Sequence, residues 1–120
     1  MQFNAKQILV GGMISAFSIS SPAAFFNGND LYGRLGDAKS GNPQDYIGAS
    51  GALGYITGIS DAMSGKIDSQ TGAKFCTPQN ATRGQLADVV FAYLNSHSEE
   101  RHLSGWSLVE AALSNAFPCR

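Results

Sequence analysis

The first two dozen residues constrain this chain most, because they predict that the remainder folds outside the cytoplasm. Lys6 is the only charged residue before Asp30, and residues 8–19 are apolar or small throughout. Small residues follow, and cleavage after Ala23 suits a signal peptidase better than cleavage after Ala24. We therefore predict a secretory signal peptide over residues 1–24 and one mature domain over residues 25–120. A membrane anchor is the alternative, but the apolar run is short and rich in Ser and Gly.

The predicted export determines how the two cysteines, Cys76 and Cys119, are interpreted. In an oxidising compartment, two cysteines in a small domain form a disulfide more often than they supply a reactive thiol. In the chain-entropy model, a bridge over a loop of this length contributes about 4 kcal/mol. We predict a Cys76–Cys119 disulfide. The alternative is a hydrolase in which Cys76 acts as a nucleophile with His97 or His102 as its base.

Spacing of apolar residues predicts helices and no strands. A short helix is expected from a cap at Asn29 or Asp30 to Leu35, and a second over residues 45–64. A third begins at Thr82, which forms a capping box with Gln85, and a fourth begins at Ser104 and places Val109, Ala112, Leu113 and Ala116 in the core. The polar stretch 65–79 is expected to be a loop. The fold class is therefore all-α, a small domain of about four helices stapled by one disulfide.

The second helix contains four glycines, which are Gly48, Gly51, Gly54 and Gly58. Each costs about 1 kcal/mol relative to alanine in a helix interior. We expect the close approach of another helix to offset this cost, either within the domain or in the seam of a homodimer.

Charge and motif patterns exclude several functions. The chain has 8 Lys and Arg against 9 Asp and Glu, so it lacks the basic excess of a nucleic-acid binder. No segment after the signal peptide is apolar enough to cross a membrane. His97 and His102 are spaced poorly for a shared metal ion, and Ser60 lacks the closing glycine of a nucleophile elbow. We predict no catalytic residues, metal or cofactor. Arg101 is within reach of Glu99, Glu100 and Glu110 along the sequence, but a surface ion pair with any of them would contribute about 1 kcal/mol at most.

Several strings in order resemble one family. They are GNDL at 28–31, LGYITGISDA at 53–62, FCTP at 75–78, GQLADVV at 84–90, ERHLS at 100–104 and AFPC at 116–119. Together they resemble the Rap/Tai immunity proteins, which protect bacteria from peptidoglycan amidases injected by type VI secretion. The chain departs from the family pattern because it lacks a second cysteine pair near Leu35 and Ala52. The first helix is therefore expected to be held by packing alone and to be the least stable part.

The resemblance implies a periplasmic, all-helical and often dimeric inhibitor that occludes the substrate groove of an amidase effector. It does not specify which effector is neutralised. Loops displayed on fixed helices commonly carry recognition. We therefore assign partner binding to two segments, the loop 66–74 and the turn 97–101, with these candidate residues: Lys66, Asp68, Ser69, Gln70, Lys74, His97, Glu99 and Arg101. Shared residues such as Gln85 and Asp88 are expected to be structural. The alternative function is a periplasmic acid-stress chaperone, which is also small, helical and disulfide-stapled.

Overall fold

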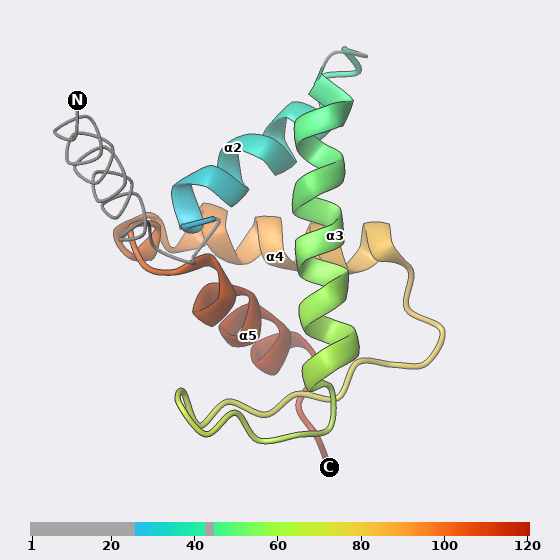
Figure 1. The fold of residues 1–120 in the computed structure, drawn as a ribbon, viewed down its shortest axis with the longest axis vertical. Coiled ribbons are helices and arrows are strands. Elements are labelled where there is room, and N and C mark those ends of the chain that lie inside the picture. Colours follow the sequence, from blue (N-terminus) through green and yellow to red (C-terminus); the bar gives the residue numbers. More distant parts are fainter. Residues whose placement is uncertain (1–25, 43–44) are drawn as a thin grey trace, which may run out of the picture.

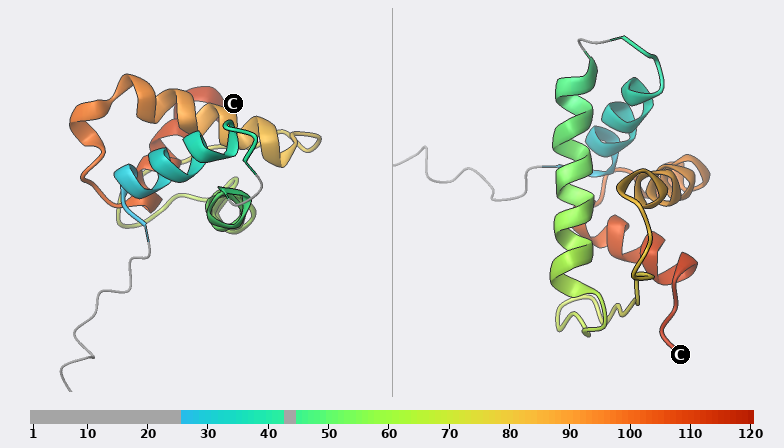
Figure 2. Two further views of the ribbon diagram at one scale, coloured as in Figure 1. Left: turned by 90° about the horizontal axis from the view of Figure 1, so that it is seen from above. Right: turned by 90° about the vertical axis from the view of Figure 1, so that its right-hand side faces the viewer.

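A computed structural model describes residues 26–42 and 45–120 of the chain. In this part, four α-helices follow one another, namely α2 (Gly28–Ala38), α3 (Asp45–Met63), α4 (Arg83–Ser96) and α5 (Gly105–Ala116), with a 3-10 turn, η2, at Ser98–Glu100 before α5. No strand occurs among these residues. The longest helix, α3, runs along one side of the molecule and crosses the other three (Figure 1, Figure 2). The all-α prediction is confirmed.

Helix α2 begins two or three residues earlier than its sequence suggested, and backbone hydrogen bonds fix that end. Its cap is Asn27, whose side chain accepts from the backbone N–H of Asp30 while the Asp30 carboxylate accepts from the N–H of Asn27. The next backbone N–H groups, of Gly28 and Asn29, donate to carbonyls of the turn after η2 at 3.0 and 2.8 Å. The expectation that packing alone holds this helix is therefore wrong.

Helix α3 buries one stripe of small and branched residues at spacings of three and four, which are Ala49, Ala52, Ile56 and Ser60. The sequence predicted close packing against all four of its glycines, and the structure shows such packing only at the first two. A Cβ at Gly48 or Gly51 would meet a side chain of α2 or of the segment before it, whereas one at Gly54 or Gly58 would meet nothing within 4 Å. The second half of the glycine face is therefore open.

Helices α4 and α5 begin at the predicted cap residues, but at Thr82 only one half of the predicted capping box forms, because the Gln85 side chain does not bond back to the Thr82 backbone. Thr82 Oγ1 accepts from the N–H of Gln85 and Ser104 Oγ accepts from the N–H of Ser107. The two helices pack against each other and close a core whose fully buried side chains include Leu31, Ile56, Phe75, Val90, Leu94, Val109 and Leu113. Ala116 is exposed rather than buried, because α5 leaves the core over its last turn.

The predicted disulfide between Cys76 and Cys119 is present, and both cysteines of the chain are used in it. Their Cα atoms lie 4.9 Å apart, and the N–H of Cys76 also donates to the carbonyl of Phe117 at 2.8 Å. The bridge therefore joins the segment before α4 to the segment after α5.

The predicted signal peptide, residues 1–24, lies outside the described residues. All described residues belong to the predicted mature domain, residues 25–120. Within the described part, no helix has the length and apolar character needed to cross a bilayer.

Candidate functional site

The segment between α3 and α4, here called the α3–α4 loop (residues 64–82), is the longest irregular segment that the structure describes. It leaves the end of α3, passes beneath α5 and then turns back to the start of α4 (Figure 1). Its backbone turns on itself, because the N–H of Asp68 donates to the carbonyl of Ala73 and the N–H of Gly72 donates to the carbonyl of Asp68. Gly72 adopts a φ of 75°, in the left-handed region where glycine is favoured.

Asp68 forms the inner support of this loop and is not a surface residue. Only 6% of it is exposed. Its carboxylate accepts hydrogen bonds from the N–H of Gln70 at 2.8 Å and from the indole Nε1 of Trp106 at 3.0 Å. The hydrogen bond from Gln70 is the main reason that the pKa of Asp68 lies below its ordinary value. The Asp68 side chain, which the sequence assigned to partner binding, is therefore buried and supports the loop from its inner side.

Glu110, on α5, lies under the same loop and is 1% exposed. The hydroxyl of Thr71 donates to its Oε1 at 2.9 Å, while its Oε2 has no hydrogen-bond partner. Burial raises the pKa of Glu110, and the neighbouring Asp68 carboxylate raises it further. Glu110 makes no ion pair with Arg101. The sequence did contain a signal for its burial, since Glu110 lies three residues before the core residue Leu113.

The outer face of the loop is exposed. It carries four of the predicted binding residues, Lys66, Ser69, Gln70 and Lys74, and all four are exposed. It also carries Ile67, which is 66% exposed and which the sequence analysis did not single out. The loop therefore presents two positive charges, two hydrogen-bonding side chains and one branched apolar side chain on a backbone that is fixed from its inner side.

The turn between α4 and α5 is mainly a structural junction. Arg101 Nε donates to the carbonyl of Leu94 at 2.8 Å and its Nη2 to the carbonyl of Asn95 at 3.4 Å. Its guanidinium lies 3.7 Å from the ring centroid of Tyr32. His97 Nδ1 is 2.8 Å from the carbonyl of Tyr93, on whose ring it stacks. Arg101 forms no ion pair with Glu99, Glu100 or Glu110, because its donors bond to carbonyls at the end of α4.

Glu99 alone among the predicted residues of this turn has an exposed side chain with no hydrogen bond or ion pair of its own. Its neighbour Glu100 accepts from the phenol of Tyr93 at 2.9 Å. No hydrogen bond or ion pair among the described residues links the turn to the α3–α4 loop. The two predicted binding segments are thus separate surfaces, of which the loop is the more exposed.

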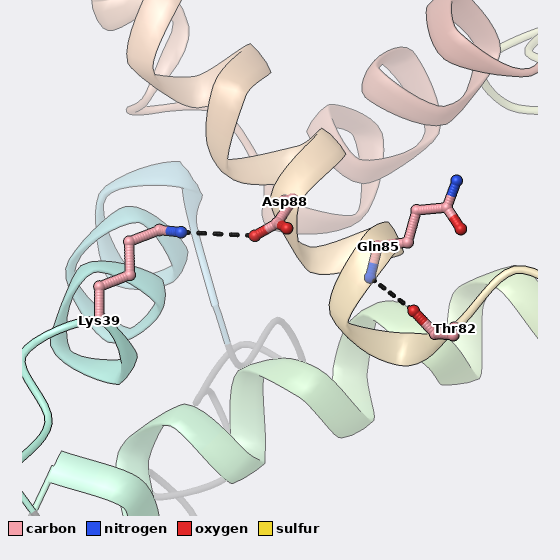
Figure 3. A network of polar contacts seen from close by, with 4 residues as sticks. All are labelled: Lys39, Thr82, Gln85 and Asp88. Atoms are coloured by element: carbon pink, nitrogen blue, oxygen red, sulfur yellow. Dashed lines mark hydrogen bonds and ion pairs between the residues drawn. The ribbon is translucent and has the colours of Figure 1, made fainter.

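Two residues shared with the resembled family, Gln85 and Asp88, lie on the first turns of α4 (Figure 3). Gln85 contributes its backbone N–H to the Thr82 cap, and its side chain points away from that cap (Figure 3). Asp88 pairs with Lys39, which ends α2, at 3.4 Å. Both partners are largely exposed, and an exposed pair of this kind contributes about 0.2–1 kcal/mol. The contacts agree with a structural role.

A polar cleft of about 540 Å³ lies between the second half of α3 and the segment leading into α4. Its wall includes the hydroxyls of Ser60 and Thr77, which are 2.8 Å apart, and the charged side chains of Asp61 and Arg83. The Ser60 hydroxyl is therefore bonded to another hydroxyl and not to a histidine. With both cysteines in the disulfide, the cysteine-nucleophile alternative lacks its thiol.

Metal-ligating side chains do not cluster in the part of the chain that the structure describes. No group of three or more His, Cys, Asp or Glu residues within it is placed to hold a metal ion.

The chain matches a known protein family over most of its length. Residues 27–119 match the family described as Rap1a immunity proteins. The matched stretch starts at the cap of α2 and ends at Cys119, so it contains every described helix and the disulfide. No curated protein gives a significant match to the chain.

Proposed function

Because the chain belongs to the Rap1a immunity protein family, we propose that it neutralises a secreted toxin effector by binding it. Such a function is a recognition task that requires a rigid scaffold and an exposed recognition surface, and it requires no catalysis by the chain itself. The family match supports this function over the acid-stress chaperone.

We propose further that the effector is a peptidoglycan amidase delivered by type VI secretion and that binding takes place in the periplasm. An amidase of this kind reaches its substrate outside the inner membrane, so the protecting protein must be exported. The signal-peptide pattern of residues 1–24 and the disulfide both support export, since disulfides persist in oxidising compartments such as the periplasm.

The observation that carries the proposed binding surface is the division of the α3–α4 loop into a fixed inner face and a free outer face. Asp68 and Thr71 are bonded to α5, whereas Lys66, Ile67 and Lys74 are exposed. A loop that is already held in its bound shape loses little conformational entropy on association. In this proposal Ser69 and Gln70 supply hydrogen bonds to the effector, and the two lysines favour an acidic rim around its substrate groove. Glu99 lies on the separate turn and is assigned to a secondary contact.

A homodimer remains part of the proposal. The exposed side of α3 around Gly54 and Gly58 would allow the backbone of a second copy to approach closely. Sedimentation equilibrium of the mature chain tests this, and a Gly54→Leu variant should weaken self-association if α3 forms the seam.

The decisive experiment for the effector is an inhibition assay. The amidase encoded beside the gene for this chain is purified and mixed with the mature chain, and the release of peptides from isolated peptidoglycan is measured. The wild-type chain should abolish release at equimolar concentration. A Lys66→Ala/Lys74→Ala variant should need at least about tenfold more protein for the same inhibition, which corresponds to about 1.4 kcal/mol of binding free energy.

The matched control is Lys39→Ala/Arg83→Ala, which also removes two positive charges, but from positions outside the loop. It should inhibit as well as the wild-type chain. Equal loss in both variants would mean that net charge and not the loop drives binding, and no inhibition by the wild-type chain would overturn the amidase as the effector.

A further inference from the structure

The inner face of the α3–α4 loop contacts α5 through two acidic side chains that belong to different elements. Asp68, on the loop, receives hydrogen bonds from its own backbone turn and from Trp106. Glu110, on α5, receives a hydrogen bond from Thr71 on Oε1, and its Oε2 is buried and receives no hydrogen bond from a protein donor. The Asp68 carboxyl group is a neighbour of Glu110 and perturbs its pKa. The loop therefore rests on a pair of neighbouring carboxyl groups that are both almost completely removed from solvent.

Two neighbouring buried carboxylates repel each other when both are ionised, and this repulsion raises the pKa of one of them. The hydrogen-bond partners decide which one it is. Asp68 accepts from three donors, the N–H groups of Gln70 and Thr71 and the indole of Trp106, all of which stabilise a negative charge. Glu110 accepts from a single hydroxyl and is buried, and the pKa values of the two groups are displaced in opposite directions, that of Asp68 downward and that of Glu110 upward.

We propose that Glu110 is the positioning residue of the α3–α4 loop: held as the neutral acid, it accepts the hydroxyl of Thr71 on one oxygen and donates the proton on the other to the carboxylate of Asp68. One proton, shared between α5 and the loop, then fixes the inner face whose opposite side is the proposed binding surface. Loss of that proton places two negative charges side by side and pushes the loop away from α5.

The surroundings contain no cation that would neutralise the second charge. The groups that perturb Glu110 are Asp68, Thr71 and Trp106, and none of them is positive. On α3, the phenol of Tyr55 contacts the backbone of Trp106, and its pKa is itself raised by burial. Lys66 and Lys74, on the loop, are exposed on its outer side.

The chain contains a built-in probe of this arrangement, because Trp106 is its only tryptophan and is bonded to Asp68. The test follows the indole N–H resonance of the mature wild-type chain from about pH 3 to about pH 9. We expect one titration step with a midpoint above 4.5, the ordinary pKa of this side chain. Above that midpoint we expect lower protection factors at the N–H groups of Gln70 and Gly72, that is, faster exchange than the pH dependence of an open amide accounts for.

Glu110→Gln is the first variant, since its amide has the shape of the neutral acid and can both accept from Thr71 and donate to Asp68. Its indole resonance should stay flat over the same pH range, and its loop should stay protected. Thr71→Val is the second variant, at an exposed position. The lost hydroxyl stabilises the ionised form of Glu110, so the midpoint should move to higher pH.

A wild-type midpoint at or below 4.5, or a titration step that persists unchanged in Glu110→Gln, would overturn the shared proton. The inference depends on the proposed function only in assigning effector binding to the loop. The shared proton and the binding surface can therefore be disproved independently of each other. If the lysine variants inhibit normally while Trp106 titrates as expected, the binding surface is wrong and the positioning role of Glu110 stands.

Discussion

The indole Nε1 of Trp106 donates a hydrogen bond of 3.0 Å to the carboxylate of Asp68, two residues 38 positions apart in the sequence. This contact attaches the middle of the α3–α4 loop to the first turn of α5. It uses a polar side chain that would otherwise be available on the loop surface, and it leaves the lysines on either side of Asp68 exposed. The loop can therefore serve as a stiff recognition element even though it contains no helix or strand.

The first prediction concerns the pH dependence of this attachment. The pKa of Asp68 lies below its ordinary value, so folding favours the ionised form. The stability contributed by Asp68 is present above its unfolded-state pKa and is lost as the pH falls through its folded-state pKa. Asp68→Asn should therefore lower the Tm by about 5 °C near neutral pH. The Tm difference between this variant and the protein that retains Asp68 should narrow toward about pH 2.

Glu110 complicates that comparison, because its raised pKa has the opposite effect and reduces stability as the pH rises. The Tm series is therefore measured with Glu110→Gln as the parent and Asp68→Asn added to it. A Tm difference that stays constant from acid to neutral pH would mean that the charge of Asp68 contributes nothing to the attachment.

Local signals in the sequence were sufficient to predict the helices, two of their caps and the disulfide. Thr82 and Ser104 each lie at the start of an apolar pattern of helical period, and their hydroxyls accept from backbone groups three residues on. The cap of α2 was misplaced because residues 27–30 contain three possible capping side chains. Asn27 was selected by the reciprocal bond with Asp30.

The structure of the candidate site could not be predicted in the same way, because it depends on contacts between distant segments. In the sequence, Asp68 is one polar residue among many in a stretch without period, and only the position of Trp106 shows that it is buried. Arg101 likewise has three glutamates within reach along the sequence. The end of α4 and the ring of Tyr32 take its guanidinium instead, because the fold brings them closer.

The second prediction concerns the disulfide. Cys76→Ser/Cys119→Ser should lower the free energy of unfolding by about 4 kcal/mol, since the unfolded chain regains the entropy of the open loop. Urea unfolding of both proteins, with and without a reductant, measures the effect. Reduction should bring the wild-type midpoint down to that of the variant and should leave the variant unchanged. A wild-type midpoint that does not respond to reduction would contradict this account.

The third prediction compares two helical glycines with opposite surroundings. A Cβ at Gly28 would lie 2.6 Å from the carbonyl oxygen of Arg101 and 2.5 Å from a methyl group of Leu108. Gly28→Ala should therefore destabilise the fold by about 1–3 kcal/mol through overpacking. A Cβ at Gly58 meets nothing within 4 Å, so Gly58→Ala should stabilise α3 by about 0.5–1 kcal/mol. Urea unfolding of the two variants measures the change in the free energy of unfolding, which should fall for Gly28→Ala and rise for Gly58→Ala. An equal change in both variants would mean that α2 approaches Arg101 less closely than the structure shows.

The fourth prediction concerns Arg101, which connects three elements. Its Nε donates to the last turn of α4, its guanidinium covers the ring of Tyr32 on α2, and its carbonyl accepts from the N–H of Asn29 at 2.8 Å. Lysine keeps the charge but cannot supply the planar, forked donor that makes the first two contacts together. Arg101→Lys should lower the free energy of unfolding by about 1–2 kcal/mol.

The matched control for this substitution is Arg83→Lys, at an exposed arginine on the first turn of α4 with no hydrogen bond or ion pair among the described residues. It should be neutral within about 0.5 kcal/mol. Native-state hydrogen exchange locates the damage, because Arg101→Lys should release the amides of α2 and the last turn of α4 before those of α5. Uniform loss of protection across all four helices would show that Arg101 supports the core as a whole and does not specifically fasten α2.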